Sequence, residues 1–246
     1  MIFLKKIILK IAFDGTEYHG WQIQPNCKTV QSVLQDALET MLKKKTIVTG
    51  CSRTDAGVHA KEFYCHFMCG DNVPDEAFLK GLNSLLPKDI AVLSAEKAED
   101  EFHARYSCLK KTYIYNYYFG TKDPFKSRYS VNIKKKPNLA YAEKFCKSII
   151  GTHDFIAFSG SKRSVESTVR TIYDCRFERN DNDYKLTVTG DGFLYNMVRI
   201  IAGSAYEAGC ELKSPDMAKN AFNSLDRNEL GITFPPQGLI LYKVYY

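Results

Sequence analysis

The strongest constraint on the fold is an order of hydrophobic periodicities that occurs twice along the 246-residue chain. Apolar residues that alternate with polar ones indicate strands, whereas apolar residues spaced by three and four indicate helices. In the first half the order is strand, helix, strand, strand, helix and strand, over residues 7–13, 30–42, 46–49, 63–69, 74–86 and 90–95. This is the order of a split β-α-β-β-α-β unit.

The same order begins again in the second half. The predicted elements there are strand 112–119, a helix at 138–150, strands 172–178 and 184–189, a nearly all-apolar helix 193–206, a short helix from Ser214 and strand 239–245. Residues 152–169 have no firm period and are predicted to form a long loop. We therefore predict an α+β fold of two ferredoxin-like units, residues 1–105 and 106–246. Their antiparallel sheets are expected side by side, with helices on one face and a cleft between the halves.

One loop stands out between two predicted strands of the first half. Residues 50–59 contain two glycines, Arg53, Asp55 and His59, with almost no bulky apolar residue. Glycine permits sharp turns and close backbone approach, and loops held by flanking strands often carry reactive groups. In an extended segment Arg53 and Asp55 would share a face. An ordinary turn, in which Asp55 bonds its own backbone, is the alternative interpretation.

The charge balance favours a polyanionic partner. Lys and Arg number 34 against 28 Asp and Glu, and this gives a formal net charge of +6. Lysines cluster at residues 5–6, 43–45, 110–111 and 134–136, alongside 16 tyrosines and 15 phenylalanines. Each cluster alone is most simply a solvated surface, but together with the aromatic residues they make nucleic acid a reasonable hypothesis.

Several classes of protein are disfavoured by the sequence. None of the eight cysteines forms a CxxC pair, and Cys65 and Cys69 lie in an alternating run, which indicates buried free thiols rather than zinc ligands or disulfides. No apolar run approaches the roughly 20 residues of a membrane helix. The first residues lack the features of a signal peptide. We therefore expect a cytoplasmic protein that does not associate with membranes.

Five ordered blocks of the sequence carry a resemblance to a known family. They are residues 13–22 with 29–31, residues 50–59, residues 102–107 with 111–115, residues 168–172, and residues 193–199 with Gly203. The chain thereby resembles the tRNA pseudouridine synthase A family over almost its whole length. It departs from the family pattern at Cys51 and Ser52, where a small apolar residue and glycine are frequent. Both residues here are also small, so the loop is expected to keep its path.

The resemblance implies an activity and a set of roles. The activity is isomerisation of uridine to pseudouridine at positions 38, 39 and 40 of the tRNA anticodon arm, by a homodimer without metal or organic cofactor. Asp55 matches the catalytic aspartate and Arg199 the arginine that pairs with it. Tyr113 matches the tyrosine that stacks on the target uracil, Arg53 a residue involved in RNA placement, and Leu239 an apolar residue against the base.

The chemistry of such a reaction suits these residue types. An ionised carboxylate can accept a proton or form a transient bond, and a nearby cation opposes the neutralisation that burial favours. Arg199 lies on an otherwise apolar helix, where a buried guanidinium without a partner would be strongly unfavourable. A structural ion pair or an exposed arginine remains the alternative. Arg170 and Arg53 are candidates for phosphate contacts, which fix position without reading sequence.

The aromatic residues and the histidines have alternative interpretations. A flipped uridine needs an aromatic platform, but Tyr113 shares its strand face with Tyr115 and Tyr117, for which a core position is the better interpretation. The histidines at 59, 66 and 103 are too far apart in pattern to suggest a metal site, and Trp21 and Cys51 are predicted to be packing residues. A non-catalytic RNA-binding module and an N-glycosidase that hydrolyses the bond are the competing functions.

Overall fold

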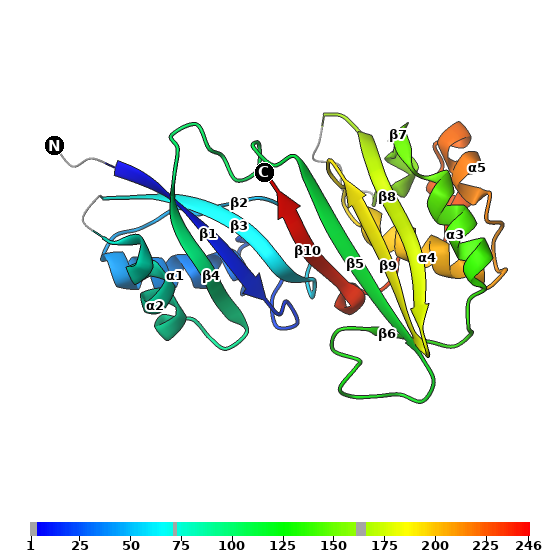
Figure 1. Ribbon diagram of the computed structural model, residues 1–246, viewed down its shortest axis with the longest axis horizontal. Coiled ribbons are helices and arrows are strands. Elements are labelled where there is room, and N and C mark those ends of the chain that lie inside the picture. The colour runs from blue at the N-terminus through cyan, green and yellow to red at the C-terminus, as the bar shows by residue number, and fades with distance from the viewer. Residues whose placement is uncertain (1–3, 71–72, 161–165) are drawn as a thin grey trace. The chain divides into compact units, whose positions relative to one another are not determined.

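The computed structural model describes residues 4–70, 73–160 and 166–246, and its chain forms two compact units. The first unit contains Met1–Leu109 together with Leu241–Tyr246, and the second contains Lys110–Ile240. The last strand, β10 (Leu239–Tyr245), therefore begins in the second unit and ends in the first (Figure 1). Among the described residues, no helix has both the length and the apolar character needed to cross a membrane.

The first unit has the predicted order of elements. These are β1 (Leu4–Phe13), α1 (Val30–Leu42), β2 (Thr49–Gly50), β3 (His59–Gly70), α2 (Asp75–Leu85) and β4 (Ile90–Ala98). The strands are antiparallel in the order β4-β1-β3, and the two-residue β2 pairs with β3. In this register Ile7 lies opposite Phe67 and Leu9 opposite Cys65, so these apolar side chains share the buried face.

Helices α1 and α2 cover that face. Helix α1 begins at Thr29, whose hydroxyl accepts from the Ser32 N–H while the Ser32 hydroxyl accepts from the Thr29 N–H, a reciprocal cap. Its Leu34 and Leu38 are buried. In α2, Phe78 packs its ring at 5.3 Å from that of Phe67 in β3. The helical stripes read from the sequence are the faces that contact the sheet.

The prediction of a strand at residues 46–49 is wrong for most of its length, because only Thr49 belongs to β2. The side chains of α1 provide the reason. The Val48 N–H donates to Gln35 Oε1 at 3.0 Å, and the Val48 carbonyl accepts from Gln31 Nε2 at 2.8 Å. Glutamine side chains thus satisfy backbone groups that a neighbouring strand would otherwise have to pair.

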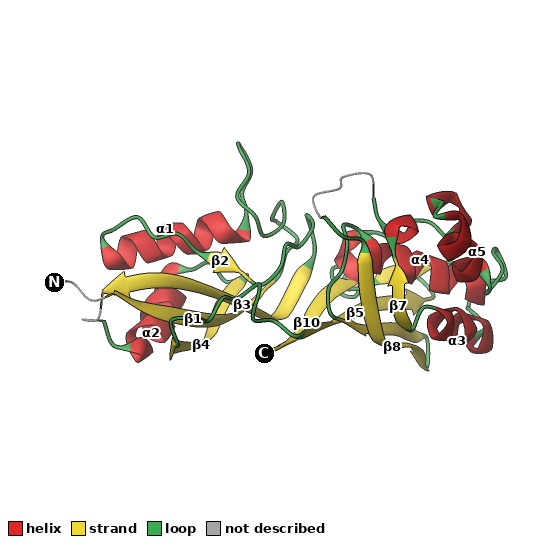
Figure 2. Ribbon diagram, turned by 90° about the horizontal axis from the view of Figure 1, so that it is seen from above, coloured by secondary structure: helices red, strands yellow, loops and turns green. Residues whose placement is uncertain are grey.

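The second unit repeats the order with additions. Its elements are β5 (Lys110–Phe119), β6 (Val131–Ile133), α3 (Leu139–Ser148), β7 (Gly151–Asp154), β8 (Val169–Asn180), β9 (Asp183–Gly190), α4 (Met197–Gly209) and α5 (Met217–Ser224). The strand order is β5-β9-β8-β7, all antiparallel, with β6 parallel to β5. Helices α3, α4 and α5 gather beside these strands (Figure 2). The predicted hairpin of β8 and β9 is confirmed.

The two largest differences from the sequence prediction in this unit concern residues 152–169 and the start of α4. Residues 152–169 are not one long loop, because Gly151–Asp154 pairs with β8 and a short 3-10 turn follows at Ile156–Phe158; residues 161–165 lie outside the described part. Helix α4 begins at Met197 rather than at 193. Asn196 has φ +62°, a left-handed conformation that cannot continue a right-handed helix.

The core of the second unit is rich in tyrosine. Tyr115 and Tyr117 are fully buried, as predicted, and each hydroxyl has an acceptor: the Pro235 carbonyl at 2.6 Å and the Ala202 carbonyl at 3.0 Å. In the first unit, Cys65 and Cys69 are buried free thiols, which confirms that prediction too.

Tyr184 differs from these core tyrosines, because its buried hydroxyl has no hydrogen-bond partner among the described residues. We expect Tyr184→Phe to raise the free energy of unfolding by about 1 kcal/mol, since it removes an unsatisfied polar group. Tyr117→Phe is the matched control and should lower that free energy by about 1 kcal/mol, since it removes a made hydrogen bond. Urea unfolding of both variants measures the difference. Equal destabilisation by the two changes would contradict the assignment.

Candidate functional site

The loop at 50–59 is held from behind by the segment that follows β1. The Gly57 N–H donates to the Tyr18 carbonyl at 3.1 Å, and the Trp21 N–H donates to the Thr54 carbonyl at 3.3 Å. These two bonds fix the backbone on both sides of Asp55. The carboxylate is therefore carried by a braced loop rather than by a free turn, as a reactive group requires.

Two glycines make this close approach possible. Gly20 has φ +82°, and a Cβ placed on it would lie 2.2 Å from the Thr54 carbonyl oxygen. A Cβ on Gly15 would lie 2.0 Å from the carbonyl oxygen of Val58. No other residue type permits two backbones to come this close. The glycines of the first sequence block thus belong to the architecture of the Asp55 loop.

His59 closes the loop as a structural residue. It is buried, its Nδ1 accepts from the Gly15 N–H at 3.1 Å, and the same atom lies 3.0 Å from Asp14 Oδ1. The contacts join the end of the loop to the end of β1. His59 is therefore placed to hold the loop rather than to meet a substrate.

His66 is also part of the packing of the first unit. Its Nδ1 accepts from the Ala104 N–H at 3.1 Å. Burial lowers the pKa of His66 to about 4, and the nearby His103 and Lys6 act in the same direction. The ring is neutral at physiological pH. Within residues 4–70, 73–160 and 166–246, no three His, Cys, Asp or Glu side chains gather in a way that could hold a metal ion.

Trp21 and Cys51 are packing residues, as the sequence predicts. The Trp21 ring is buried at 4.2 Å from the ring of Phe63, and a Cβ on Gly50 would lie 2.6 Å from it. Cys51 is buried as well, and its N–H donates to the Tyr64 carbonyl. By contrast Asp55 is half-buried and Arg53 is exposed, so these two are the charged side chains that the loop presents.

The second unit carries the other predicted residues. Tyr113 lies in β5, opposite Val188 of β9, and is 5% exposed. The Phe193 ring stands edge-on to it at 5.2 Å, which fixes the plane of the tyrosine ring. Leu239 is buried at the start of β10. It follows a 3-10 turn, Pro236–Gly238.

Arg199 is oriented by two neutral acceptors. Its Nε donates to the Phe234 carbonyl at 2.7 Å, and one terminal nitrogen donates to Asn196 Oδ1 at 2.9 Å. These bonds direct the guanidinium. The side chain is half-buried on α4. No pattern in the sequence predicts a role for Asn196 or Phe234, and only the position of Asn196 inside the fifth block could have drawn attention to it.

The connection from β9 to α4, residues 191–196, links three of these side chains. It contributes Phe193 to Tyr113 and Asn196 to Arg199. A Cβ on Gly192 would lie 3.2 Å from Nε of Arg170. Arg170 also donates to the Ser167 carbonyl at 3.0 Å. The structure thus brings Tyr113, Arg170 and Arg199 around one short segment of the second unit, while Arg53 and Asp55 share the loop of the first.

The comparisons with known proteins agree on one family. The profile described as tRNA pseudouridine synthase matches residues 10–107 and 145–246. "tRNA pseudouridine synthase A 2" of Clostridium perfringens is 40% identical over 99% of this chain and 100% of its own. "tRNA pseudouridine synthase A" is 43% identical in Ruminiclostridium cellulolyticum, over 99% of this chain and 100% of its own, and 42% identical in Bacillus subtilis, over 96% and 97%.

A solved structure is similar only weakly. The crystal structure of a Cbf5-Nop10-Gar1 complex matches 82% of this chain and 54% of that chain, with 11% sequence identity and a TM-score of 0.33. The relationship therefore rests on the sequences.

Proposed function

Because this chain belongs to the tRNA pseudouridine synthase family, we propose that it isomerises uridine to pseudouridine at positions 38, 39 and 40 of the tRNA anticodon arm. The observation that carries the proposal is identity of 40–43% to relatives of that name over 99% of this chain. The braced loop around Asp55 supports it, since a catalytic carboxylate must be held in place. The mildly basic composition suits an RNA substrate.

The proposed reaction requires a base or a nucleophile from the protein. The bond between the sugar and N1 of uracil breaks, the base turns, and the sugar is rejoined through C5; the hydrogen on C5 leaves to solvent and N1 gains a proton. Nothing is oxidised or reduced, so the chain's own side chains suffice. Asp55 would act as base or nucleophile at the sugar or at the base.

Arg199 would keep that carboxylate ionised. A guanidinium is always charged, and an opposite charge within several ångströms favours the ionised form of a carboxyl group. The support for this pairing is that the Phe234 carbonyl and Asn196 Oδ1 accept from Arg199 and so hold its guanidinium in a fixed direction. We infer that Arg199 is the partner that keeps Asp55 ionised.

The remaining residues would receive the RNA. Tyr113 would flank the extruded uracil, with its plane set by Phe193. Leu239 would provide an apolar contact to the base. Arg53 is exposed and would help to place the RNA, whereas Arg170 would contact a phosphate.

A second copy of the chain is the further partner that we propose. A tRNA is longer than one subunit, so a homodimer would let it contact both copies. We also place the protein in the cytoplasm, in keeping with a tRNA substrate and with eight cysteines that are all free thiols.

A tritium-release assay tests the activity. With tRNA carrying tritium on C5 of uracil, the wild-type protein should release label in an amount equal to the pseudouridine formed at positions 38–40. Free uracil as the product would identify an N-glycosidase instead. RNA binding without any release would identify a non-catalytic module. Mapping of modified uridines in tRNA from cells lacking the protein then checks the positions.

A further inference from the structure

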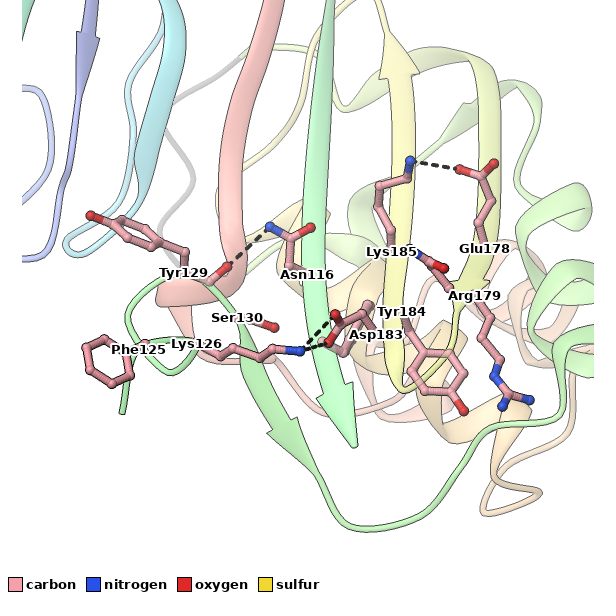
Figure 3. Close-up of a pocket in the computed structure, with 12 residues that line it drawn as sticks. Asn116, Phe125, Lys126, Tyr129, Ser130, Glu178, Arg179, Asp183, Tyr184 and Lys185 are labelled. Atoms are coloured by element: carbon pink, nitrogen blue, oxygen red, sulfur yellow. Dashed lines mark hydrogen bonds and ion pairs between the residues drawn. The ribbon is translucent and has the colours of Figure 1, made fainter. Parts of the chain in front are cut away.

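The second unit contains a pocket that none of the predicted site residues lines. Its volume is about 520 Å³, and it lies between the segment that leaves β5 and the β8–β9 hairpin (Figure 3). That volume is within the range of small-ligand sites. One wall comes from Phe125, Lys126 and Tyr129, and the other from Arg179, Asp183 and Lys185. The first wall falls between the two ranges that the family profile matches.

The charges of the pocket favour an anion. Lys126 Nζ lies 2.6 Å and 2.8 Å from the two carboxylate oxygens of Asp183, and Lys185 Nζ lies 3.3 Å from Glu178. Both acidic residues of the lining are thus paired with lysines. Arg179 donates instead to a backbone carbonyl, at 2.6 Å, so that bond does not cancel its charge. An excess of positive charge remains for a ligand.

The segment that forms the first wall adds positive charge around the pocket. Residues 120–136 carry six cationic side chains against one acidic residue, Asp123; the cations are Lys122, Lys126, Arg128, Lys134, Lys135 and Lys136. A basic stretch raises the local concentration of polyanions. The same stretch holds aromatic residues, and this combination is typical of surfaces that bind nucleic acid.

The aromatic group at the rim is presented by a rigid turn. The Phe125 side chain is 90% exposed. Asp123 Oδ1 accepts from the N–H groups of Phe125 and Lys126, at 2.8 Å and 3.2 Å, and the Tyr129 N–H donates to the Lys126 carbonyl. The ion pair with Asp183 then joins the turn to the hairpin. A preorganised, exposed ring beside cations is what base stacking requires.

We propose that this pocket binds a short single-stranded segment of the RNA substrate other than the uridine that is isomerised. One base stacks on Phe125, and a phosphate farther along the same strand lies at Arg179, at the other end of the pocket (Figure 3). The proposal rests on the proposed function for the class of ligand. Charge complementarity favours RNA over a protein partner here, because an apolar protein surface would leave the uncancelled Arg179 charge desolvated on contact.

Equilibrium binding of unmodified tRNA tests the pocket. Phe125→Ala should weaken binding by about fivefold to a hundredfold, as expected for the loss of one stacked base, without changing the salt dependence. Arg179→Gln should weaken binding and reduce the slope of log K against log salt by about 1. Tyr141→Ala and Lys219→Gln, an exposed tyrosine on α3 and an exposed lysine on α5, are the matched controls and should bind as wild type does. Phe125→Trp should retain binding.

The outcomes separate this proposal from the activity. At saturating tRNA the single-turnover rate of Phe125→Ala should equal that of wild type. If the wild-type protein is active and neither pocket substitution weakens the binding of tRNA, the pocket proposal is wrong and the proposed activity stands. If the wild-type protein is inactive but its binding of tRNA depends on the pocket residues, the pocket proposal stands and the proposed activity is wrong. If Phe125→Ala instead turns a dimer into a monomer in sedimentation velocity, the ring belongs to an interface between copies, and the RNA site is rejected.

Discussion

Replacing Asp55 with asparagine is expected to abolish pseudouridine formation while tRNA still binds. The substitution keeps the size of the side chain and removes its charge, so the loop should keep its bond to the Tyr18 carbonyl and its bond from the Trp21 N–H. An amide can neither accept the proton nor form the transient bond at neutral pH. Loss of general-base participation alone should lower the rate by roughly 10²- to 10⁴-fold, and loss of a covalent bond to the substrate would lower it further.

Single-turnover kinetics at saturating tRNA provide the measurement, and fluorescence anisotropy gives the affinity. Asp36→Asn is the matched control, because Asp36 is an exposed acid on α1, away from the loop. It should react at the wild-type rate. A rate for Asp55→Asn within tenfold of wild type would remove Asp55 from the chemistry, whatever the affinity.

The sequence predicts well those features that depend on residues close to one another in the chain. The stripe of α1 and its cap at Thr29 depend on residues within a few positions of one another, and both are confirmed. The bounds of β10 follow from a simple alternation. The strand expected at 46–49 fails because Gln31 and Gln35, more than ten residues away, take its backbone bonds. The hydrophobic periodicity of the sequence does not predict such a contact.

The candidate site shows the same limit. Asp55 and Arg199 are proposed for it because they lie in blocks that resemble a family, and not because any spacing marks them. Asn196, which accepts from Arg199, lies inside the apolar run for which the sequence predicts one helix over residues 193–206. The left-handed backbone at Asn196 ends that continuity. The sequence also placed all of β10 in the second half, whereas Leu241–Tyr246 belong to the first unit.

The bracing of the Asp55 loop depends on a contact that only a structure reveals. Gly20 combines φ +82° with a backbone approach that would leave a Cβ 2.2 Å from the Thr54 carbonyl oxygen. We expect Gly20→Ala to lower the free energy of unfolding by about 3 kcal/mol or more, because backbone strain and a clash with another backbone add together. The loop must also move, and a displacement of about 1 Å in a catalytic group costs on the order of 10²-fold in rate.

Gly120 offers the matched control for this change. It too has a positive φ, +129°, but a Cβ placed on it would meet nothing within 4 Å. Gly120→Ala should therefore show backbone strain alone, of about 1–3 kcal/mol, and should keep the wild-type single-turnover rate. Chemical unfolding and kinetics on both variants, at a temperature where each is folded, isolate the effect of the clash. If Gly20→Ala is no less active than Gly120→Ala, then the contact with Thr54 does not position Asp55, and the loop must be held by its other bonds.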